Sequence, residues 1–196
     1  MDANGQSAHV AESLEQAGHD SLYDSLTGLP NRDLFVDRLD RAIKRSHRSG
    51  GPVAVIFADL DSFKSVNETY GHGIGDELLK AVAGRLRQLL RSGDTVARLM
   101  GDEFVILCED LRSVSHVTLI AARVDAGLNE PFGLSSTEIE VSASVGIAFA
   151  GGDEEIPEQI LEEADITMSV MKRTSKVTHP VFDLRAPRTD PVVPAI

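Results

Sequence analysis

The residues best suited to chemistry are four acids at the ends of two β-prone segments: Asp59, Asp61, Asp102 and Glu103. Asp59 closes the apolar run 53–60, and Asp61 follows two positions later, so both side chains share one side if the extended geometry continues. Asp102 and Glu103 lie in a tight turn between two apolar segments.

If that turn adjoins the end of the run 53–60, the acids converge, and converging carboxylates without a Lys or Arg between them repel one another. A hard divalent cation such as Mg²⁺, held by one or two carboxylates and by substrate phosphates, relieves this repulsion and suits a nucleotide substrate. Solvated acids at a strand end and at a turn are the alternative. The residues alone leave both interpretations open.

Such acids need a scaffold, and hydrophobic periodicity predicts one. The continuous apolar run 53–60 indicates a strand buried on both faces. Residues 96–108 indicate a hairpin, and residues 138–150 an alternating strand. Helical spacing predicts helices from 34 to the breaker at 49–52 and over about 62–70, 78–90, 114–128 and 157–171. A hairpin among alternating helices and strands predicts an α+β fold, an α/β sandwich whose sheet is mixed or mainly antiparallel.

Composition limits the class of partner. The 196 residues are 42% hydrophobic, which is enough for one domain core. A formal net charge of −12 argues against nucleic acid or an anionic membrane as partner. The single Cys108 lies in an apolar run, which indicates a buried thiol. Because no apolar run approaches the ~20 residues of a membrane span and no signal-peptide pattern opens the chain, we expect a cytoplasmic protein.

Three segments carry a resemblance to a known family: "DSLTGLPNR" at 24–32, "DLDSFKSVNETYGHGIGDELL" at 59–79 and "RLMGDEF" at 98–104. In order and spacing they resemble the hallmark segments of the GGDEF family of diguanylate cyclases, with a divergent MGDEF signature. The resemblance implies a five-stranded, mainly antiparallel central sheet wrapped by helices, similar to the palm of nucleotide cyclases and polymerases. We expect this domain over 21–183, a lead-in helix or tail over 1–20, and a disordered, proline-rich tail over 184–196.

The resemblance also implies the chemistry. It assigns condensation of two GTP molecules into cyclic di-GMP with release of pyrophosphate, by two domains that face each other in a homodimer. It assigns Asp59 and Asp102 as ligands of Mg²⁺ or Mn²⁺, with help from the Leu60 carbonyl. Glu103 lies beside the metal, as a further ligand or in activating the attacking 3′ hydroxyl. Bound Mg²⁺ polarises the α-phosphate and neutralises charge on the leaving pyrophosphate.

Substrate-binding residues follow from the same resemblance. The resemblance assigns Asn67 and Asp76 to the recognition of guanine. Without the resemblance, Asn67 would be an ordinary Asn at a helix C-terminus and Asp76 an ordinary acid in a first helical turn. The remaining positions are Phe63 packing under the site, Lys64 approaching a phosphate, Gly101 letting substrate approach the backbone, and Lys172 and Lys176 at the terminal phosphates. Arg91 and Asp94 match an inhibitory site for the product cyclic di-GMP, for which an exposed ion pair is the alternative.

Two departures from the family pattern leave a choice of function. Met100 stands where most members have glycine, and a left-handed backbone there would cost roughly 1–2 kcal/mol unless Gly101 alone takes positive φ. At the phosphate clamp, Lys176 replaces the usual arginine and loses its bidentate fork. The chain is therefore either a diguanylate cyclase, or a catalytically degenerate module that binds GTP or cyclic di-GMP as a regulatory sensor.

Overall fold

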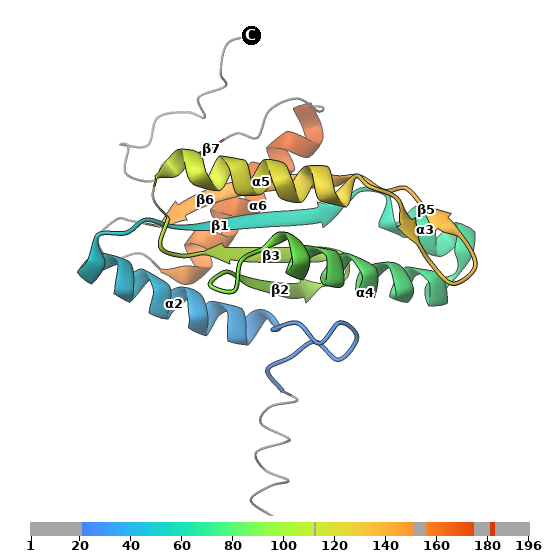
Figure 1. Cartoon of the computed structure of the whole chain (residues 1–196), viewed down its shortest axis with the longest axis horizontal. Coiled ribbons are helices and arrows are strands. Elements are labelled where there is room, and N and C mark those ends of the chain that lie inside the picture. The colour runs from blue at the N-terminus through green and yellow to red at the C-terminus, as the bar shows by residue number, and fades with distance from the viewer. Residues whose placement is uncertain (1–20, 112, 151–155, 175–180, 183–196) are drawn as a thin grey trace, which may run out of the picture.

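The structure, a computed structural model, describes residues 21–111, 113–150, 156–174 and 181–182 (Figure 1). Its helices are α2 (Arg32–Ser49), α3 (Phe63–Tyr70), α4 (His72–Leu89), α5 (Val114–Leu128) and α6 (Pro157–Thr174). Its strands are β1 (Val53–Leu60), β2 (Thr95–Met100), β3 (Glu103–Cys108), β4 (Phe132–Gly133), β5 (Glu138–Ile139), β6 (Ala143–Ala150) and β7 (Val181–Phe182).

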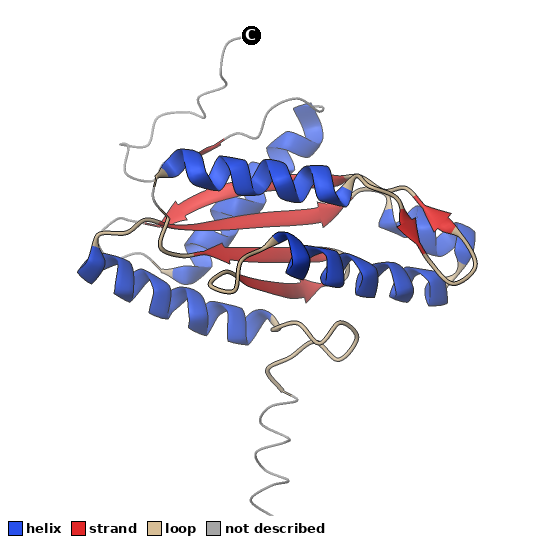
Figure 2. Ribbon diagram, viewed as in Figure 1, coloured by secondary structure: helices blue, strands red, loops and turns tan. Residues whose placement is uncertain are grey.

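A five-stranded sheet in the order β2-β3-β1-β6-β7 forms the centre, and β4 pairs with β5 in a separate small sheet. All pairs in the central sheet are antiparallel except β6 with β7, which are parallel. Figure 2 shows α5 in front of this sheet and α6 behind it. The predicted α+β fold with a mainly antiparallel five-stranded sheet is therefore confirmed.

Each face of the sheet has its own apolar core, and the side chains of β1 alternate between them. Val53, Val55 and Phe57 join residues of α2 and α6 in one cluster. The alternate residues join residues of α4 and α5 in the other cluster; they are Ala54, Ile56, Ala58 and Leu60. We call the first side the α6 face. This alternation explains why the predicted strand 53–60 is apolar throughout: helices cover both of its faces.

Most predicted elements appear with small shifts at their ends, but α4 begins at His72, well before the predicted start at about 78, and one prediction was wrong. The segment 138–150 is not one strand, because Glu138–Ile139 pairs with β4 and only Ala143–Ala150 pairs with β1. Its partner β1 ends at Leu60, opposite Ala143, so no neighbouring strand extends the ladder further. Helix α6 reaches Thr174, beyond the predicted end at residue 171.

The expected lead-in helix or tail over 1–20 and the expected tail over 184–196 lie outside the described residues. The domain limits of 21–183 stay a prediction. Within the described part of the chain, no helix combines the length and the apolar character needed to cross a bilayer.

Candidate active site

Strand pairing brings three polar residues into one row across the sheet. Asp59 at the end of β1 lies opposite Glu103 on β3 and opposite Ser144 on β6. By the alternation of β1, Asp59 follows Phe57 on the α6 face, and Glu103 shares the face of Val105. The acids at the strand ends therefore face the helix that carries Lys172 and Asp165.

The turn between β2 and β3 presents Asp102 next to this row. Its backbone carbonyl accepts a hydrogen bond from Leu60 N at 3.4 Å, so the turn lies against the end of β1. Gly101 has φ of 51°, whereas Met100 keeps a negative φ and extends, 68% exposed, from the end of β2. The sequence left open whether Met100 would be strained in a left-handed conformation or whether Gly101 alone would take positive φ. In this turn Gly101 alone takes it, so Met100 is not strained.

Arg98 fixes the turn through hydrogen bonds to the Gly101 carbonyl, a role that the sequence did not predict. Its guanidinium donates to the Gly101 carbonyl from Nε at 2.9 Å and from Nη2 at 2.7 Å, and its Nη1 donates to both Asp24 oxygens at 3.0 and 3.1 Å. Asp24 also accepts from the backbone and hydroxyl of Thr27. Although burial opposes it, these hydrogen bonds lower the pKa of Asp24. The segment 24–32 thus anchors the acid-bearing turn.

Lys172 on α6 lies among the acids on the α6 face. Its Nζ donates to Asp59 Oδ1 at 2.5 Å and lies 3.9 Å from Asp61 Oδ1. Burial opposes its charge, but the hydrogen bond with Asp59 and the charges of Asp59, Asp61 and Asp102 outweigh burial and raise the pKa of the Lys172 ammonium. Lys172, the lysine predicted to contact a phosphate, is therefore a counter-ion of these acids.

Helix α6 reaches this position because it packs directly on the β6 backbone. A Cβ added at Gly146 would lie 2.3 Å from Ala164 O and 2.3 Å from Met168 N, so only glycine allows the approach. Lys172 follows Met168 by one helical turn and is therefore brought above the end of β1.

The carboxylates perturb one another in spite of the lysine. Burial, and then the charge of Asp59, raise the pKa of Asp102. Burial raises the pKa of Glu103, with further contributions from the charges of Asp165, Asp59 and Asp102. Burial and the charge of Asp59 likewise raise the pKa of Asp165. Asp165 was not among the predicted site residues, because an acid on an amphipathic helix gives no local sign of its partners.

A divalent cation fits this donor set. The oxygens are hard ligands. Burial, together with the charges of neighbouring carboxylates, raises the pKa of Asp102 and of Glu103, and a bound cation would favour their ionised forms. No closed cage of three or more His, Cys, Asp or Glu side chains is present within the described ranges. A site that uses one or two carboxylates and completes its shell with phosphates and water needs no such cage. Asp59 and Asp102, with the Leu60 carbonyl, are the residues that would hold the ion.

The predicted guanine readers lie where α3 meets α4. A Cβ added at Gly75 would lie 2.0 Å from Asn67 Oδ1 and 3.3 Å from Phe63 Cζ, so the Asn67 amide rests against the start of α4. Asp76 follows Gly75 directly and is exposed. Phe63 is partly buried and packs on the core cluster that contains residues of α4 and α5. That it lies under a substrate site stays a prediction. The local fold therefore places the Asn67 amide against α4 at the residue that precedes Asp76.

Two further predicted phosphate contacts, those of Lys64 and Lys176, are not tested by this geometry. The Lys64 side chain is 88% exposed, and its Nζ lies 3.6 Å from Glu68 Oε1 within α3. Lys176 lies outside the described residues. Their predicted contacts with phosphate stay predictions.

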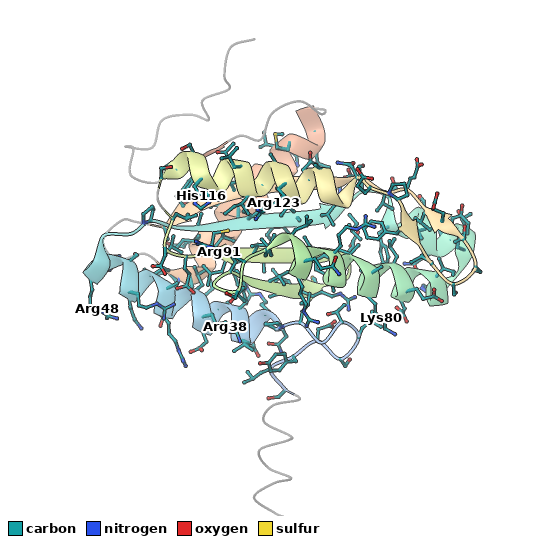
Figure 3. All side chains as sticks on the ribbon, viewed as in Figure 1. Arg38, Arg48, Lys80, Arg91, His116 and Arg123 are labelled. Carbon is teal, nitrogen blue, oxygen red and sulfur yellow. The ribbon has the colours of Figure 1, made fainter. Side chains whose placement is uncertain are left out.

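The predicted inhibitory pair lies at the other end of the hairpin from the turn. Arg91 is labelled in Figure 3, in the segment after α4. Its Nε donates to Asp94 Oδ1 at 3.0 Å, and its Nη2 donates to the Glu109 carbonyl. The Asp94 side chain is fully buried, whereas that of Arg91 is 42% exposed. Asp94 therefore orients Arg91, and Arg91 is the member of the pair that faces solvent.

Comparison with known proteins gives this geometry a family. A family model described as "Diguanylate cyclase, GGDEF domain" matches residues 21–177. The chain is 42% identical over 163 residues to the bifunctional diguanylate cyclase/cyclic di-GMP phosphodiesterase MucR of Pseudomonas aeruginosa, a match that covers 81% of this chain and 24% of MucR. It is 36% identical over 182 residues to the diguanylate cyclase TpbB of the same organism, covering 92% of this chain and 42% of TpbB. The chain thus spans less than half the length of either relative.

Solved structures agree with the sequence comparison. The isolated GGDEF domain of TpbB superposes with a TM-score of 0.78 at 37% identity, over 83% of this chain and 95% of that chain. The coiled coil and GGDEF domain of DgcB from Caulobacter crescentus, solved in complex with c-di-GMP, gives a TM-score of 0.80 at 27% identity, over 89% of this chain and 93% of that chain. Since the family model covers most of the residues and these relatives share the fold, the chain belongs to the GGDEF domain family.

Proposed function

We propose that this chain is a Mg²⁺-dependent diguanylate cyclase domain that condenses two GTP molecules into cyclic di-GMP and releases two pyrophosphates. The observation that carries the proposal is the position of Asp102 against the end of β1, where Asp59 and Asp102 share one electrostatic environment. Relatives named as diguanylate cyclases support the assignment.

Each bond-forming step joins the 3′ oxygen of one GTP to the α-phosphorus of the other and breaks the bond to the β-phosphate. When bound, Mg²⁺ would supply Lewis-acid polarisation of the α-phosphate and charge neutralisation of the leaving group. Asp59 and Asp102 would hold the ion, and Lys172 would offset the charge of the terminal phosphates. Glu103, whose pKa is raised by burial and by neighbouring carboxylates, is suited to accept the proton of the 3′ hydroxyl.

Asn67 and Asp76 give the proposed site its base specificity. The Asn67 amide donates to guanine O6, and the Asp76 carboxylate accepts from N1–H and the exocyclic amine, a pattern that adenine does not match. Because one domain holds one GTP, the reaction needs a second copy facing the first, and the proposed partner is a homodimer. The proposed compartment is the cytoplasm, and a buried, unpaired Cys108 agrees with a reducing compartment.

The proposal is tested by incubating purified protein at high concentration with GTP and either Mg²⁺ or Mn²⁺, and identifying nucleotides by mass spectrometry. We expect cyclic di-GMP from the wild type and none from Asp102→Asn. Asp33→Asn, which removes an exposed acid in the first turn of α2, is the matched control and should retain activity. Absence of cyclic di-GMP from the wild type refutes the proposal. Calorimetry with GTP and cyclic di-GMP then tests the degenerate, binding-only alternative.

We also propose that Arg91 binds the product cyclic di-GMP and so limits the activity. Asp94 and the Glu109 carbonyl fix the guanidinium with part of its fork facing solvent, where it can meet a guanine edge or a phosphate. Arg91→Ala should weaken binding of cyclic di-GMP in calorimetry, while Arg41→Ala on α2 should not. Equal affinity for the wild type and Arg91→Ala would contradict this second proposal.

A further inference from the structure

Lys172 is shared between two acids that are held in different ways. Its Nζ is hydrogen-bonded to Asp59 Oδ1 at 2.5 Å and is 3.9 Å from Asp61 Oδ1. The Asp59 side chain is 15% exposed and that of Lys172 is 45% exposed, so the ammonium lies between the sheet and solvent. Any ligand of Asp59 must compete with this ammonium.

Asp61 is fixed by the strand next to β1. Asp61 Oδ2 accepts from Ser142 Oγ at 2.6 Å, and Oδ1 accepts from Ser144 Oγ at 2.7 Å. Its backbone N–H donates to the Ser142 carbonyl at 2.8 Å. Each carboxylate oxygen therefore has its own hydroxyl donor, and the carboxylate cannot turn towards a cation at Asp59 without losing one of these bonds.

A divalent cation on the Asp59 carboxylate would repel the ammonium that is hydrogen-bonded to it. Lys172 then has one neighbouring anion that stays in place, which is Asp61. A lysine side chain is long and flexible, so it can transfer its hydrogen bond over this short distance without movement of α6.

We propose that Asp61 is a positioning residue for Lys172: the ammonium pairs with Asp59 in the metal-free protein and moves to Asp61 when a divalent cation binds, which keeps it beside the terminal phosphates. This inference rests on the proposed function, which assigns Asp59 to the cation and Lys172 to GTP. Ser142 and Ser144 set the direction of Asp61 and act through it. The cation and the nucleotide then help each other to bind, because the phosphates give the displaced ammonium a partner.

The competition between Lys172 and a divalent cation for Asp59 is tested by Mn²⁺ binding without nucleotide, measured by electron paramagnetic resonance of the free ion. Lys172→Met should bind Mn²⁺ about three- to tenfold more tightly than the wild type, because it removes a competing cation from a half-buried ion pair. Lys44→Met is the matched control, since Lys44 makes a 2.6 Å ion pair with Asp40 on α2, and it should leave Mn²⁺ binding unchanged. Unchanged affinity in Lys172→Met, or no Mn²⁺ binding by any variant, would overturn the proposal.

The positioning role is tested by a double-mutant cycle in which no carboxylate is removed. The variant Ser142→Ala/Ser144→Ala should weaken binding of an α,β-methylene GTP analogue in saturating Mg²⁺ by about three- to fivefold, the effect of losing two orienting hydrogen bonds. In the Lys172→Met background the same serine changes should alter affinity by less than about twofold, because their effect passes through the lysine. GMP, which lacks terminal phosphates, should bind all variants alike.

Two results would contradict the positioning role: full affinity of the serine variant for the analogue, or an equal loss of affinity with and without Lys172. The single variants Ser142→Ala and Ser144→Ala, with melting temperatures, separate a folding defect from lost orientation. None of these measurements requires turnover. If no cyclic di-GMP forms but the double-mutant cycle gives the expected coupling, the proposed function is refuted and the positioning of Lys172 by Asp61 stands. If cyclic di-GMP forms but the cycle shows no coupling, only the positioning role is refuted.

Discussion

Replacing Arg98 with methionine tests how the turn that carries Asp102 is held in place. The guanidinium makes two hydrogen bonds to the Gly101 carbonyl and two to the Asp24 carboxylate. The Arg98 side chain is only 12% exposed, so water does not readily replace these partners. Methionine retains much of the apolar stem and removes all four hydrogen bonds.

The expected loss of stability follows from these contacts. Removing one partner of a largely buried, charge-assisted pair costs about 3–5 kcal/mol when the remaining charge has no other donor. Asp24 keeps two hydrogen bonds from Thr27, at 2.8 and 2.5 Å, and its side chain is 21% exposed. We therefore expect the free energy of unfolding to fall by about 2–3 kcal/mol. A shift of the turn by about 1 Å would lower turnover roughly 100-fold, because Asp102 leaves its position.

Urea unfolding followed by circular dichroism measures the stability, and cyclic di-GMP formation measures the turnover. Arg41→Met is the control, since its pair with Asp37 is exposed, at 67% and 47%, and should contribute less than about 1 kcal/mol. Arg98→Lys should recover part of the stability but not the full turnover, because lysine lacks the planar fork. If Arg98→Met is as stable and as active as the control, Arg98 does not hold the turn.

Three further changes probe the site. Gly75→Ala places a methyl group against Asn67 and should raise KM for GTP about tenfold in steady-state assays. Gly84→Ala in the same helix has open space around its Cβ and should leave KM unchanged; equal KM values for the two variants would contradict the base-reading role of Asn67. Asp102→Asn should raise the melting temperature of the metal-free protein at neutral pH, because burial and the charge of Asp59 raise the pKa of Asp102 and so disfavour its ionised form in the fold. This gain should shrink as pH falls through the raised pKa and be absent below the pKa of an unfolded aspartate; a gain that persists in acid would refute the sign. Met100→Gly should raise turnover by removing an exposed side chain beside the site and lower the free energy of unfolding by about 0.5–1 kcal/mol, and unchanged turnover would show that methionine is not limiting.

Much of the scaffold could be predicted because its signals are local. The strand 53–60 and the helix 114–128 have the predicted limits, since apolar runs and helical spacing are properties of consecutive residues. The segment 138–150 was predicted as one strand because its alternation continues through Val141, which is buried in the same core as Val145. Its division depends on where β1 ends, which is information from a distant part of the chain.

The site was less accessible to sequence reasoning because its contacts are long-range. Arg98 and Asp24 are 74 positions apart, and Lys172 and Asp59 are 113 apart, so no local pattern joins them. Motif spacing identified the acids and Lys172 individually. It did not indicate that the lysine would be hydrogen-bonded to Asp59, the carboxylate proposed to bind the metal, or that an arginine two residues before Met100 would fasten the turn. The φ of Met100 likewise depends on the bulge in the β2–β3 ladder.

The most direct test of the central claim is a crystal structure of the protein with Mg²⁺ and a non-hydrolysable GTP analogue. The account predicts a metal ion at about 2.0–2.1 Å from carboxylate oxygens of both Asp59 and Asp102, with Lys172 moved away from Asp59. A metal ion bound only to phosphates and water, with Lys172 still paired to Asp59, would contradict it.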